Sequence, residues 1–428
     1  MHDSTFAADP YQMYDRIREH GSAGPVELAP NVEATLVVGH EMALRVLHNA
    51  ALFPRDARRW ADLNQGRVPL DSPVLAMMVY RPNCLFTDGA VHLRLRKAVT
   101  ESLDRLNVTR IRRDVEPIAA YLLDKFSERG HADLIHEYAK LLPLLLFNKL
   151  FDCPAGIGET VTRTLSDIFD GKDVMRANDE LTAALMELIS LKRRAPGDDV
   201  TSWLIQHPAG LNDEELKDQL VMLMGAGVEP ERNLIGNALV RLLSQDGTGW
   251  SLQIEDAIDQ VLLNDTPIAN YATHYPVQDV DLDGVIAKAN TPVVISFAGA
   301  NRDLALSTAG QAHSGAHLAW GAGAHACPAK GPAHVIATTA IELLLNALPD
   351  VSLAVPAHDL QWRPGPFHRA LTHLPVTFSP TPATRMAALP HRARSQASEN
   401  MPMPRPTGVS HTLPRKGLWG QFLDLFRV

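Results

Sequence analysis

Apolar positions along most of the chain recur three and four residues apart, which is the period of an amphipathic α-helix. Shorter runs rich in β-branched residues, at 25–30, 33–39, 279–296, 352–355 and 374–378, predict strands, and Pro30-Asn31 predicts a hairpin turn between the first two. The helical period covers residues 11–20, 41–50, 91–103, 115–129, 134–151, 159–191, 212–244, 254–264 and 328–347. The pattern therefore predicts a mainly α protein with small β-sheets.

The helical and strand patterns end near Pro380, and residues 1–380 are expected to form one large domain. Residues 381–415 are rich in Pro, Arg, Ser and Ala and predict a flexible linker. Within 416–428, an apolar stripe at i, i+3, i+4 and i+7 predicts a short amphipathic helix, formed by Trp419, Phe422, Leu423 and Phe426. So short a helix needs a surface to dock on, which leaves its own domain, a partner protein or a membrane surface.

Composition narrows the class of protein. The 428 residues are 46% hydrophobic and carry 40 Lys+Arg against 49 Asp+Glu, a net charge of −9. This acidic excess argues against a sequence-independent nucleic-acid binder. No apolar run approaches the roughly 20 residues of a membrane span, and the N-terminus has no signal-peptide pattern. Three cysteines cannot build a disulfide framework, so the expected location is the cytoplasm, with peripheral membrane association as the alternative if the tail helix binds a membrane.

One of these cysteines has a distinctive neighbourhood. Cys327 lies where a Gly-rich loop, Trp320-Gly-Ala-Gly-Ala-His-Ala-Cys, runs into the helix predicted at 328–347. Gly321 and Gly323 permit tight turns and close backbone approach. A helix N-terminus favours a thiolate, which could be a nucleophile, a redox thiol or a metal ligand. By itself the loop also allows Cys327 to be a small buried apolar residue.

This loop resembles the haem-ligand loop of the cytochrome P450 superfamily, Phe-Gly-x-Gly-x-His-x-Cys-x-Gly, with Trp in place of Phe and Ala329 in place of the last Gly. The positions in register are Trp320, Gly321, Gly323, His325 and Cys327. The resemblance implies that Cys327 is the axial thiolate of haem b (iron protoporphyrin IX), with Trp320 near the sulfur and His325 reaching a haem propionate. It also implies the P450 fold, a triangular prism that holds haem between the long I-helix and the Cys loop with its following L-helix.

A second motif is His92-Leu-Arg-Leu-Arg96, with Asp88 upstream, which resembles the His-x-x-x-Arg of the family's C-helix. His92 and Arg96 are four residues apart and share one helix face. The resemblance makes them binders of the haem propionates, whereas by themselves they would be read as a solvated basic face.

The helix predicted at 212–244 carries Ala226-Gly227-Val228-Glu229, which resembles the I-helix motif over the oxygen-binding side of haem. The small side chains of Ala226 and Gly227 are expected to let O2 and substrate approach. The family follows the acid with Thr, which helps to deliver protons, but here Pro230 has no hydroxyl and is expected to kink the helix. Proton delivery is therefore expected through Glu229, ordered water or a substrate hydroxyl.

The family's K-helix Glu-x-x-Arg is replaced at both ends, by Gln260 and Leu263, while the Ala-Asn-Arg-Asp motif at 300–303 is intact. Loss of both charges together can be nearly neutral, so it predicts a repacked helix. His274 stands where a strand Arg of the family binds propionate. The chain thus most resembles soluble actinobacterial, Streptomyces-like members, in the subgroup that lacks Glu-x-x-Arg.

The resemblance implies a haem-thiolate monooxygenase that inserts one oxygen atom from O2 into an apolar small molecule. No flavin or ferredoxin segment is recognisable, so electrons are expected from a separate ferredoxin and ferredoxin reductase. Residues 55–81, with Met77, Met78 and Val79, resemble the variable substrate-recognition region, although core packing explains these side chains equally well. Two other functions stay open: a low-turnover haem-binding accessory or signalling component of a membrane-associated complex, and peroxide-driven oxidation.

Overall fold

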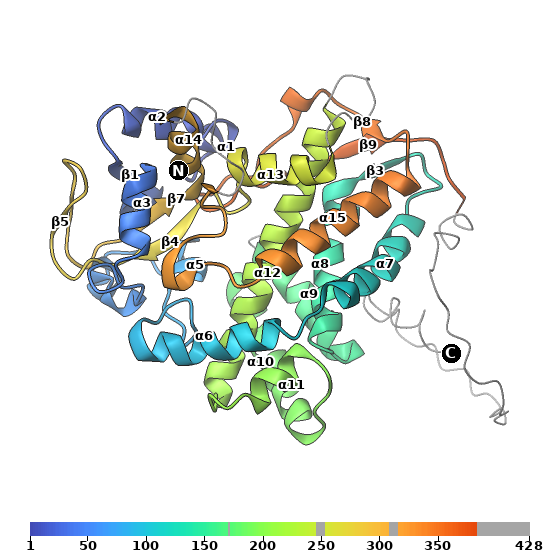
Figure 1. The fold of residues 1–428 in the computed structure, drawn as a ribbon, viewed down its shortest axis with the longest axis horizontal. Helices are drawn as coiled ribbons and strands as arrows, with labels where there is room; N and C mark the ends of the chain where they lie inside the picture. The colour runs from blue at the N-terminus through green and yellow to red at the C-terminus, as the bar shows by residue number, and fades with distance from the viewer. Residues whose placement is uncertain (170–171, 245–252, 308–315, 383–428) are drawn as a thin grey trace.

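The computed structural model describes residues 1–169, 172–244, 253–307 and 316–382. The described chain is mainly helical, with a sheet-containing part on the left of Figure 1 and a helical body on the right. The linker predicted at 381–415, apart from its first two residues, and the helix predicted at 416–428 lie outside the described residues. The helices are α1 (Ser4–Ala8), α2 (Tyr11–Arg18), α3 (His40–Leu47), α4 (Ala61–Asn64), α5 (Leu75–Met78), α6 (Gly89–Leu103), α7 (Val108–Asp124), α8 (Leu141–Leu150), α9 (Ala155–Phe169), α10 (Val174–Arg194), α11 (Val200–Gln206), α12 (Asp213–Leu243), α13 (Ile254–Asn264), α14 (Phe297–Ser307) and α15 (Lys330–Ala347).

The largest sheet has the strand order β1-β2-β7-β4, formed by β1 (Ala23–Ala29), β2 (Val32–Val37), β7 (Val293–Ser296) and β4 (Asn270–His274). The hairpin predicted at Pro30-Asn31 is confirmed: β1 and β2 pair antiparallel, and Asn31 has a φ of 63°, a turn conformation that Asn tolerates. β7 then pairs parallel to β2 and antiparallel to β4. This sheet places His274, at the end of β4, beside the segment that follows α3.

Two smaller sheets complete the fold. One has the order β3-β9-β8, with β3 (His131–Asp133), β9 (Pro375–Thr377) and β8 (Ser352–Leu353), and joins the middle of the chain to its last described strand. The other is the pair β5 (Val280–Asp281) and β6 (Ile286–Ala287). The strands predicted at 352–355 and 374–378 are thereby confirmed, although each is shorter than its apolar run. The run at 279–296 forms three short strands, β5, β6 and β7, rather than two strands joined at one turn.

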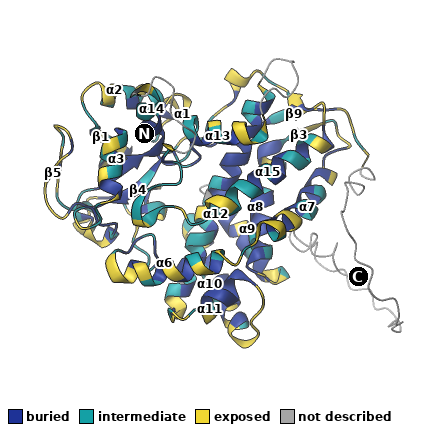
Figure 2. Cartoon of the chain, viewed as in Figure 1, coloured by how far each residue is buried: buried dark blue, intermediate teal, exposed yellow. Residues whose placement is uncertain are grey.

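The long helix α12 runs through the middle of the helical body, where Figure 2 shows much of it buried. It begins with a capping box, in which the Asn212 side chain accepts from the Glu215 N–H and the Glu215 carboxylate accepts from the Asn212 N–H. The buried apolar side chains of α12 belong to one large cluster that also contains side chains of α7, α8 and α15. Pro230 lies inside α12, and the helix continues without a break on both sides of it.

Some predicted helices have different bounds. The run at 115–129 belongs to α7, which begins earlier because the Asn107 side chain accepts from the Arg110 N–H and caps it. The run at 134–151 divides into a π-helical turn, η2 (Ile135–Ala139), and α8. The run at 159–191 is two helices, α9 and α10.

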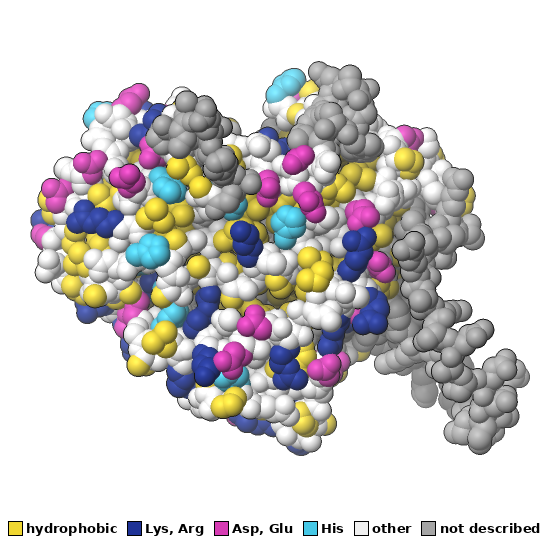
Figure 3. All heavy atoms as spheres, viewed as in Figure 1, with side chains coloured by type: hydrophobic (Ala, Val, Ile, Leu, Met, Phe, Trp, Pro, Cys, Tyr) yellow, Lys and Arg dark blue, Asp and Glu magenta, His cyan; other side chains and the backbone are white. Residues whose placement is uncertain are grey.

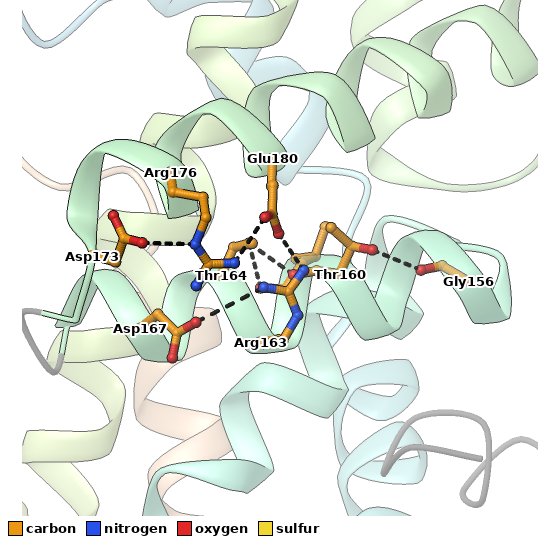
Figure 4. Close-up of polar contacts among 9 residues, drawn as sticks. Gly156, Thr160, Arg163, Thr164, Asp167, Asp173, Arg176 and Glu180 are labelled. Atoms are coloured by element: carbon orange, nitrogen blue, oxygen red, sulfur yellow. Dashed lines mark hydrogen bonds and ion pairs between the residues drawn. The ribbon is translucent and has the colours of Figure 1, made fainter. Parts of the chain in front are cut away.

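Helices α9 and α10 are two separate helices, and ion pairs between charged side chains connect them. Figure 4 shows Arg163 of α9 and Arg176 of α10 on either side of Glu180, whose carboxylate pairs with both guanidinium groups. Asp173, just before α10, pairs with Arg176 at 2.8 Å. These groups are largely exposed, so the pairs orient the two helices more than they stabilise them.

The intact Ala-Asn-Arg-Asp motif at 300–303 holds elements together. The Asn301 amide donates to the Leu262 carbonyl of α13 at 3.1 Å, and its oxygen accepts from the Leu318 N–H at 2.7 Å, where the Cys loop begins. Asp303 accepts from the His40 N–H at the start of α3. The motif thus connects α13 and α14 to the loop that carries Cys327.

Helix α13 carries the positions of the missing Glu-x-x-Arg. It packs through Ala257, Ile258, Val261 and Leu262, which are buried, whereas Gln260 is exposed and accepts a hydrogen bond from Asn264 at 2.9 Å. Helix α13 therefore packs against the rest of the protein through an apolar face.

On the face shown in Figure 3, Lys and Arg side chains are interspersed with Asp and Glu side chains. This face therefore has no extended region of one charge sign. None of the helices in the described ranges is both long and apolar enough to cross a bilayer.

Candidate functional site

The Cys loop turns back on itself before α15. The Cys327 N–H donates to the Trp320 carbonyl at 2.7 Å, closing the loop. Gly321 and Gly323 both have positive φ, 67° and 70°, and a Cβ on Gly323 would overlap the Leu47 carbonyl at the end of α3. Glycine at 323 therefore meets both a backbone and a packing requirement.

The Cys327 thiol is exposed, unlike those of Cys84 and Cys153, which are buried. Surrounding protein atoms raise the pKa of the Cys327 thiol, whereas the Ala329 N–H, 3.4 Å from Sγ, and the charge of Arg96 act to lower it. The net effect leaves the pKa of the Cys327 thiol above its ordinary value, so the thiolate that metal ligation requires would form when the metal binds. By comparison, burial raises the pKa of Cys84 to about 11.

Helix α6 packs against this loop through the two residues predicted from its spacing. The imidazole rings of His92 and His325 are in tilted contact, with centroids 4.1 Å apart and an interplanar angle of 39°, and the Arg96 guanidinium donates to the Ala326 carbonyl. Burial lowers the pKa of His325 to about 4, although a contact with Asp88, 3.7 Å away, opposes the effect. Both histidines are thus neutral donors at neutral pH.

His274, at the end of β4, lies in the same region. Its Nδ1 bonds to the Phe53 carbonyl at 2.7 Å, and burial together with the charge of Arg55 lowers the pKa of this histidine to about 3. With Nδ1 donating to the carbonyl, Nε2 of the neutral ring is an acceptor, and it would donate only after protonation or a change of tautomer.

Arg55 is a residue that the sequence did not single out. It is 5% exposed, and its charge lowers the pKa of both His274 and His325. Its backbone N–H donates to the Asp88 carboxylate at 2.8 Å, but within the described ranges no carboxylate pairs with its guanidinium. A buried, unpaired guanidinium is costly unless it meets an anion. Only its position beside His274 identifies it, since 219 residues of sequence separate the two.

Several buried polar atoms around the Cys loop lack a hydrogen-bond partner in the described part of the chain, and a bound haem would supply partners for them. Buried nitrogens of Arg55, His92, His274 and Trp320 have no hydrogen-bond partner among the described residues. Buried polar groups are nearly always paired, so such a group beside an exposed thiol points to an anionic ligand. Two propionates, a flat ring and a metal that accepts a thiolate meet these requirements together.

Ala226 and Gly227 of α12 lie in different surroundings. Ala226 is exposed, whereas a Cβ on Gly227 would overlap the Phe147 ring of α8. A Cβ on Gly225 would meet nothing within 4 Å. Gly227 therefore serves close packing of α12 on α8, and open space lies beside Gly225 and Ala226.

Glu229 is held by two guanidinium groups. Its carboxylate accepts from Arg363, in the last described part of the chain, and lies 3.4 Å from Arg232. Burial would raise the pKa of Glu229, but the charges of Arg363 and Arg232 outweigh it and leave the pKa below its ordinary value. Glu229 is therefore a carboxylate at neutral pH.

Glu231 is a second acid on the same turn that the sequence did not single out. It is 5% exposed, and its Oε1 has no hydrogen-bond partner among the described residues. Burial holds the pKa of Glu231 well above its ordinary value, and its charge, if present, would raise the pKa of the Cys327 thiol. Glu231 is therefore a neutral acid on the side of α12 that faces the Cys loop.

Known proteins with similar sequences identify the family. The chain is 31% identical over 397 residues to the cytochrome P450 monooxygenase PikC of Streptomyces venezuelae, covering 87% of this chain and 91% of that protein. The chain belongs to the cytochrome P450 superfamily. The 6-deoxyerythronolide B hydroxylase of Saccharopolyspora erythraea is 26% identical over 403 residues, 88% of this chain and 98% of that one. None of the family models compared with the sequence matches it.

Solved structures agree with this assignment. CYP154C4 from Streptomyces sp. W2061 superposes with a TM-score of 0.78 at 26% identity, over 87% of this chain and 96% of its own. CYP154A1 from Streptomyces coelicolor A3(2) gives 0.74 at 26% identity, over 86% and 98%. This P450 is accordingly a haem-dependent monooxygenase, an oxidoreductase whose cofactor is haem b, as its sequence predicted.

Proposed function

We propose that this P450 inserts one oxygen atom from O2 into an apolar small molecule, with electrons from a separate ferredoxin and ferredoxin reductase. The observation that carries the proposal is the exposed Cys327 thiol, which faces the Ala329 N–H and the charge of Arg96. A thiolate ligand suits haem to O–O bond cleavage.

In this proposal the Cys327 thiolate would ligate the haem iron, and the loop of Trp320, Gly321 and Gly323 would support it. Propionates would be held by the donors His92, Arg96, His325 and Arg55. His274 would join them only after a change of tautomer, because its Nδ1 proton is bonded to the Phe53 carbonyl. When bound, the haem thiolate supplies the activation of O2, and the protein supplies orientation, a dry pocket and protons.

Proton supply distinguishes this chain from the family pattern. Pro230 replaces the usual Thr, and Glu229 is a carboxylate held by Arg363 and Arg232. We assign the proton-donating role to the neutral carboxyl group of Glu231, because two nearby acids with opposite protonation can divide the acid and base roles. Glu229 then keeps its arginine partners in place.

The substrate is expected to be a bulky apolar molecule. Relatives include the mycinamicin IV hydroxylase/epoxidase of Micromonospora griseorubida, 28% identical over 334 residues, and the 6-deoxyerythronolide B hydroxylase. Within the segment expected to recognise substrate, Met78 is buried in the core, Met77 is half-buried and Val79 is exposed. Met77 and Val79 are therefore the better candidates for contact with substrate.

Two measurements test the proposal. The reduced, CO-bound protein should show the red-shifted Soret band that gives the family its name, and Cys327→Ser should abolish it. A panel of apolar compounds, supplied with ferredoxin, its reductase and O2, should yield at least one mono-oxygenated product. A normal red-shifted band without turnover of any compound that shifts the haem spin state would contradict the proposed activity while leaving haem ligation intact.

Pro230 also favours a second candidate, peroxide-driven oxidation, in which peroxide supplies the oxygen and no electron partner is needed. Product formation with peroxide alone, at a rate equal to or above that with ferredoxin and reductase, would favour this second route. A role as a haem-binding accessory or signalling component rests on Pro230, on the missing Glu-x-x-Arg and on the helix predicted at 416–428. An unchanged set of co-purifying proteins after deletion of that helix would remove the last of these motives.

A further inference from the structure

A group of possible metal ligands lies on the β3–β9 sheet, outside the haem site. Asp133 is the last residue of β3, His136 belongs to the π-helical turn η2, and His373 lies two residues before β9. Asp133 Oδ2 is 2.8 Å from His136 Nδ1 and 2.6 Å from His373 Nδ1. All three ligand atoms lie within 4.8 Å of one another.

The backbone fixes this arrangement. β3 and β9 pair antiparallel with Asp133 opposite Pro375, which brings the segment before β9 alongside Asp133. The other carboxylate oxygen, Oδ1, accepts from the Ile135 and Leu374 N–H groups at 3.0 Å each. Asp133 is therefore oriented by the main chain of both neighbouring segments, and Oδ2 is left to face the two imidazoles.

A further layer of contacts supports the carboxylate. Glu137 accepts from the Asp133 N–H at 2.9 Å and also pairs with Arg129. Groups that orient ligands in this way contribute strongly to metal affinity. The two imidazole rings face each other with centroids 4.8 Å apart and an interplanar angle of 34°. Neither ring is enclosed, because the side chains of His136 and His373 are 42% and 61% exposed.

We propose that Asp133, His136 and His373 bind a first-row divalent cation such as Zn²⁺ through Oδ2 and the two Nδ1 atoms. Two imidazoles and one carboxylate are a ligand set that zinc accepts, with open positions left for water. Ligand atoms around one zinc ion lie about 3.3 Å apart at bond lengths of about 2.0–2.1 Å. The exposed histidines reach this spacing by small rotations while the carboxylate stays in place.

Such a site would stabilise the sheet that closes the described chain, because it connects β3, η2 and the entry to β9. Ligation through Nδ1 requires each ring to be neutral with its proton on Nε2, so bonds to the metal replace the two hydrogen bonds to Asp133. The inference is independent of haem chemistry and of the proposed monooxygenase activity.

The test uses the haem-loaded protein, freed of any polyhistidine tag and of metal by EDTA, and titrated calorimetrically with zinc chloride. We expect one site with a Kd near or below roughly 10 µM. His136→Asn and His373→Asn should each weaken it by at least about tenfold. The matched control is His131→Asn, because His131 is an exposed histidine of β3 that bonds to the Arg129 carbonyl and lies outside the cluster.

Thermal unfolding gives a second readout that does not depend on heat of binding. Zinc should raise the Tm of the wild type and of His131→Asn, but not that of the double variant His136→Asn/His373→Asn. The haem spectrum should be the same in these three proteins with and without zinc. The inference is overturned if the wild type binds no zinc tighter than roughly 100 µM, or if the double variant binds it as the wild type does.

Discussion

Glu229 and Glu231 are two residues apart on α12 and are buried almost equally, 1% and 5% exposed, yet their carboxyl groups differ in protonation. Residues two apart on a helix point about 200° away from each other. Glu229 points to Arg363 and Arg232, which stabilise its charge, whereas Glu231 has no cation beside it and keeps its proton. This difference leads to three predictions.

The first concerns activity. Glu231→Gln keeps the shape of the side chain but removes the transferable proton, so we expect the rate of product formation to fall about 100-fold. Consumption of reductant should continue with peroxide released instead of product. The CO-bound spectrum should stay unchanged, which separates a lost proton donor from a damaged haem site. A variant with the full rate of product formation would show that protons reach the site by another path.

The second concerns the pH dependence of stability at the same position. Because the folded pKa of Glu231 lies above its unfolded value of about 4.3, the folded protein binds the extra proton and the wild type loses stability as pH rises. Glu231→Gln does not titrate. Its stability relative to the wild type should therefore increase by roughly 1–3 kcal/mol between pH 5 and pH 8, as measured by urea unfolding. A difference independent of pH would mean that Glu231 is ionised in the folded protein.

Glu229→Gln should behave in the opposite way. The folded pKa of Glu229 is lowered, so its contribution is present above the unfolded value of about 4.3 and is lost as pH falls through the folded pKa. Removing the carboxylate takes a counter-charge from the buried Arg232 and the partly buried Arg363, which should cost about 3 kcal/mol at pH 7. Unfolding curves at pH 7 and pH 4 test this, and the cost should be smaller at pH 4.

Arg55 gives a fourth prediction, on haem retention. Arg55→Gln removes the buried cation beside His274 and His325, so transfer of haem to an acceptor apoprotein should be about tenfold faster. Arg59→Gln is the matched control, since Arg59 is exposed and bonds to the Asn290 side chain. Equal transfer rates for the two variants would mean that Arg55 does not hold the propionates.

The glycines of α12 provide the fifth. Gly227→Ala should cost about 1–3 kcal/mol of unfolding free energy, because the new methyl group overlaps the Phe147 ring. Gly225→Ala, where nothing lies within 4 Å, should stabilise the helix by about 0.5–1 kcal/mol. Adding Phe147→Leu to Gly227→Ala should recover part of the loss, and a lack of recovery would place the strain elsewhere.

Most of the correct predictions from the sequence concerned residues that are close together in the chain. The periodicity located the longer helices, such as α6, α12 and α15, but missed the shorter helices α4, α5, α11 and α14. Gly321, Gly323 and Cys327 identified the Cys loop because loop, turn and helix start are consecutive. The positions of His92 and Arg96 on one face of α6 followed from their spacing. Errors arose at breaks, such as the one between α9 and α10, where a single glycine, Gly171, stands in an otherwise helical pattern and does not by itself predict a helix end.

The sequence by itself thus determined the family, the thiolate candidate and the order of the elements, because these depend on local spacing. Only the tertiary structure placed Arg55 beside His274, left Glu231 without a cation, filled the space beside Gly227 with Phe147, and assembled Asp133, His136 and His373. Each of these depends on which segments pack together and on the charges that burial leaves unpaired. Spacing along a chain does not encode that information.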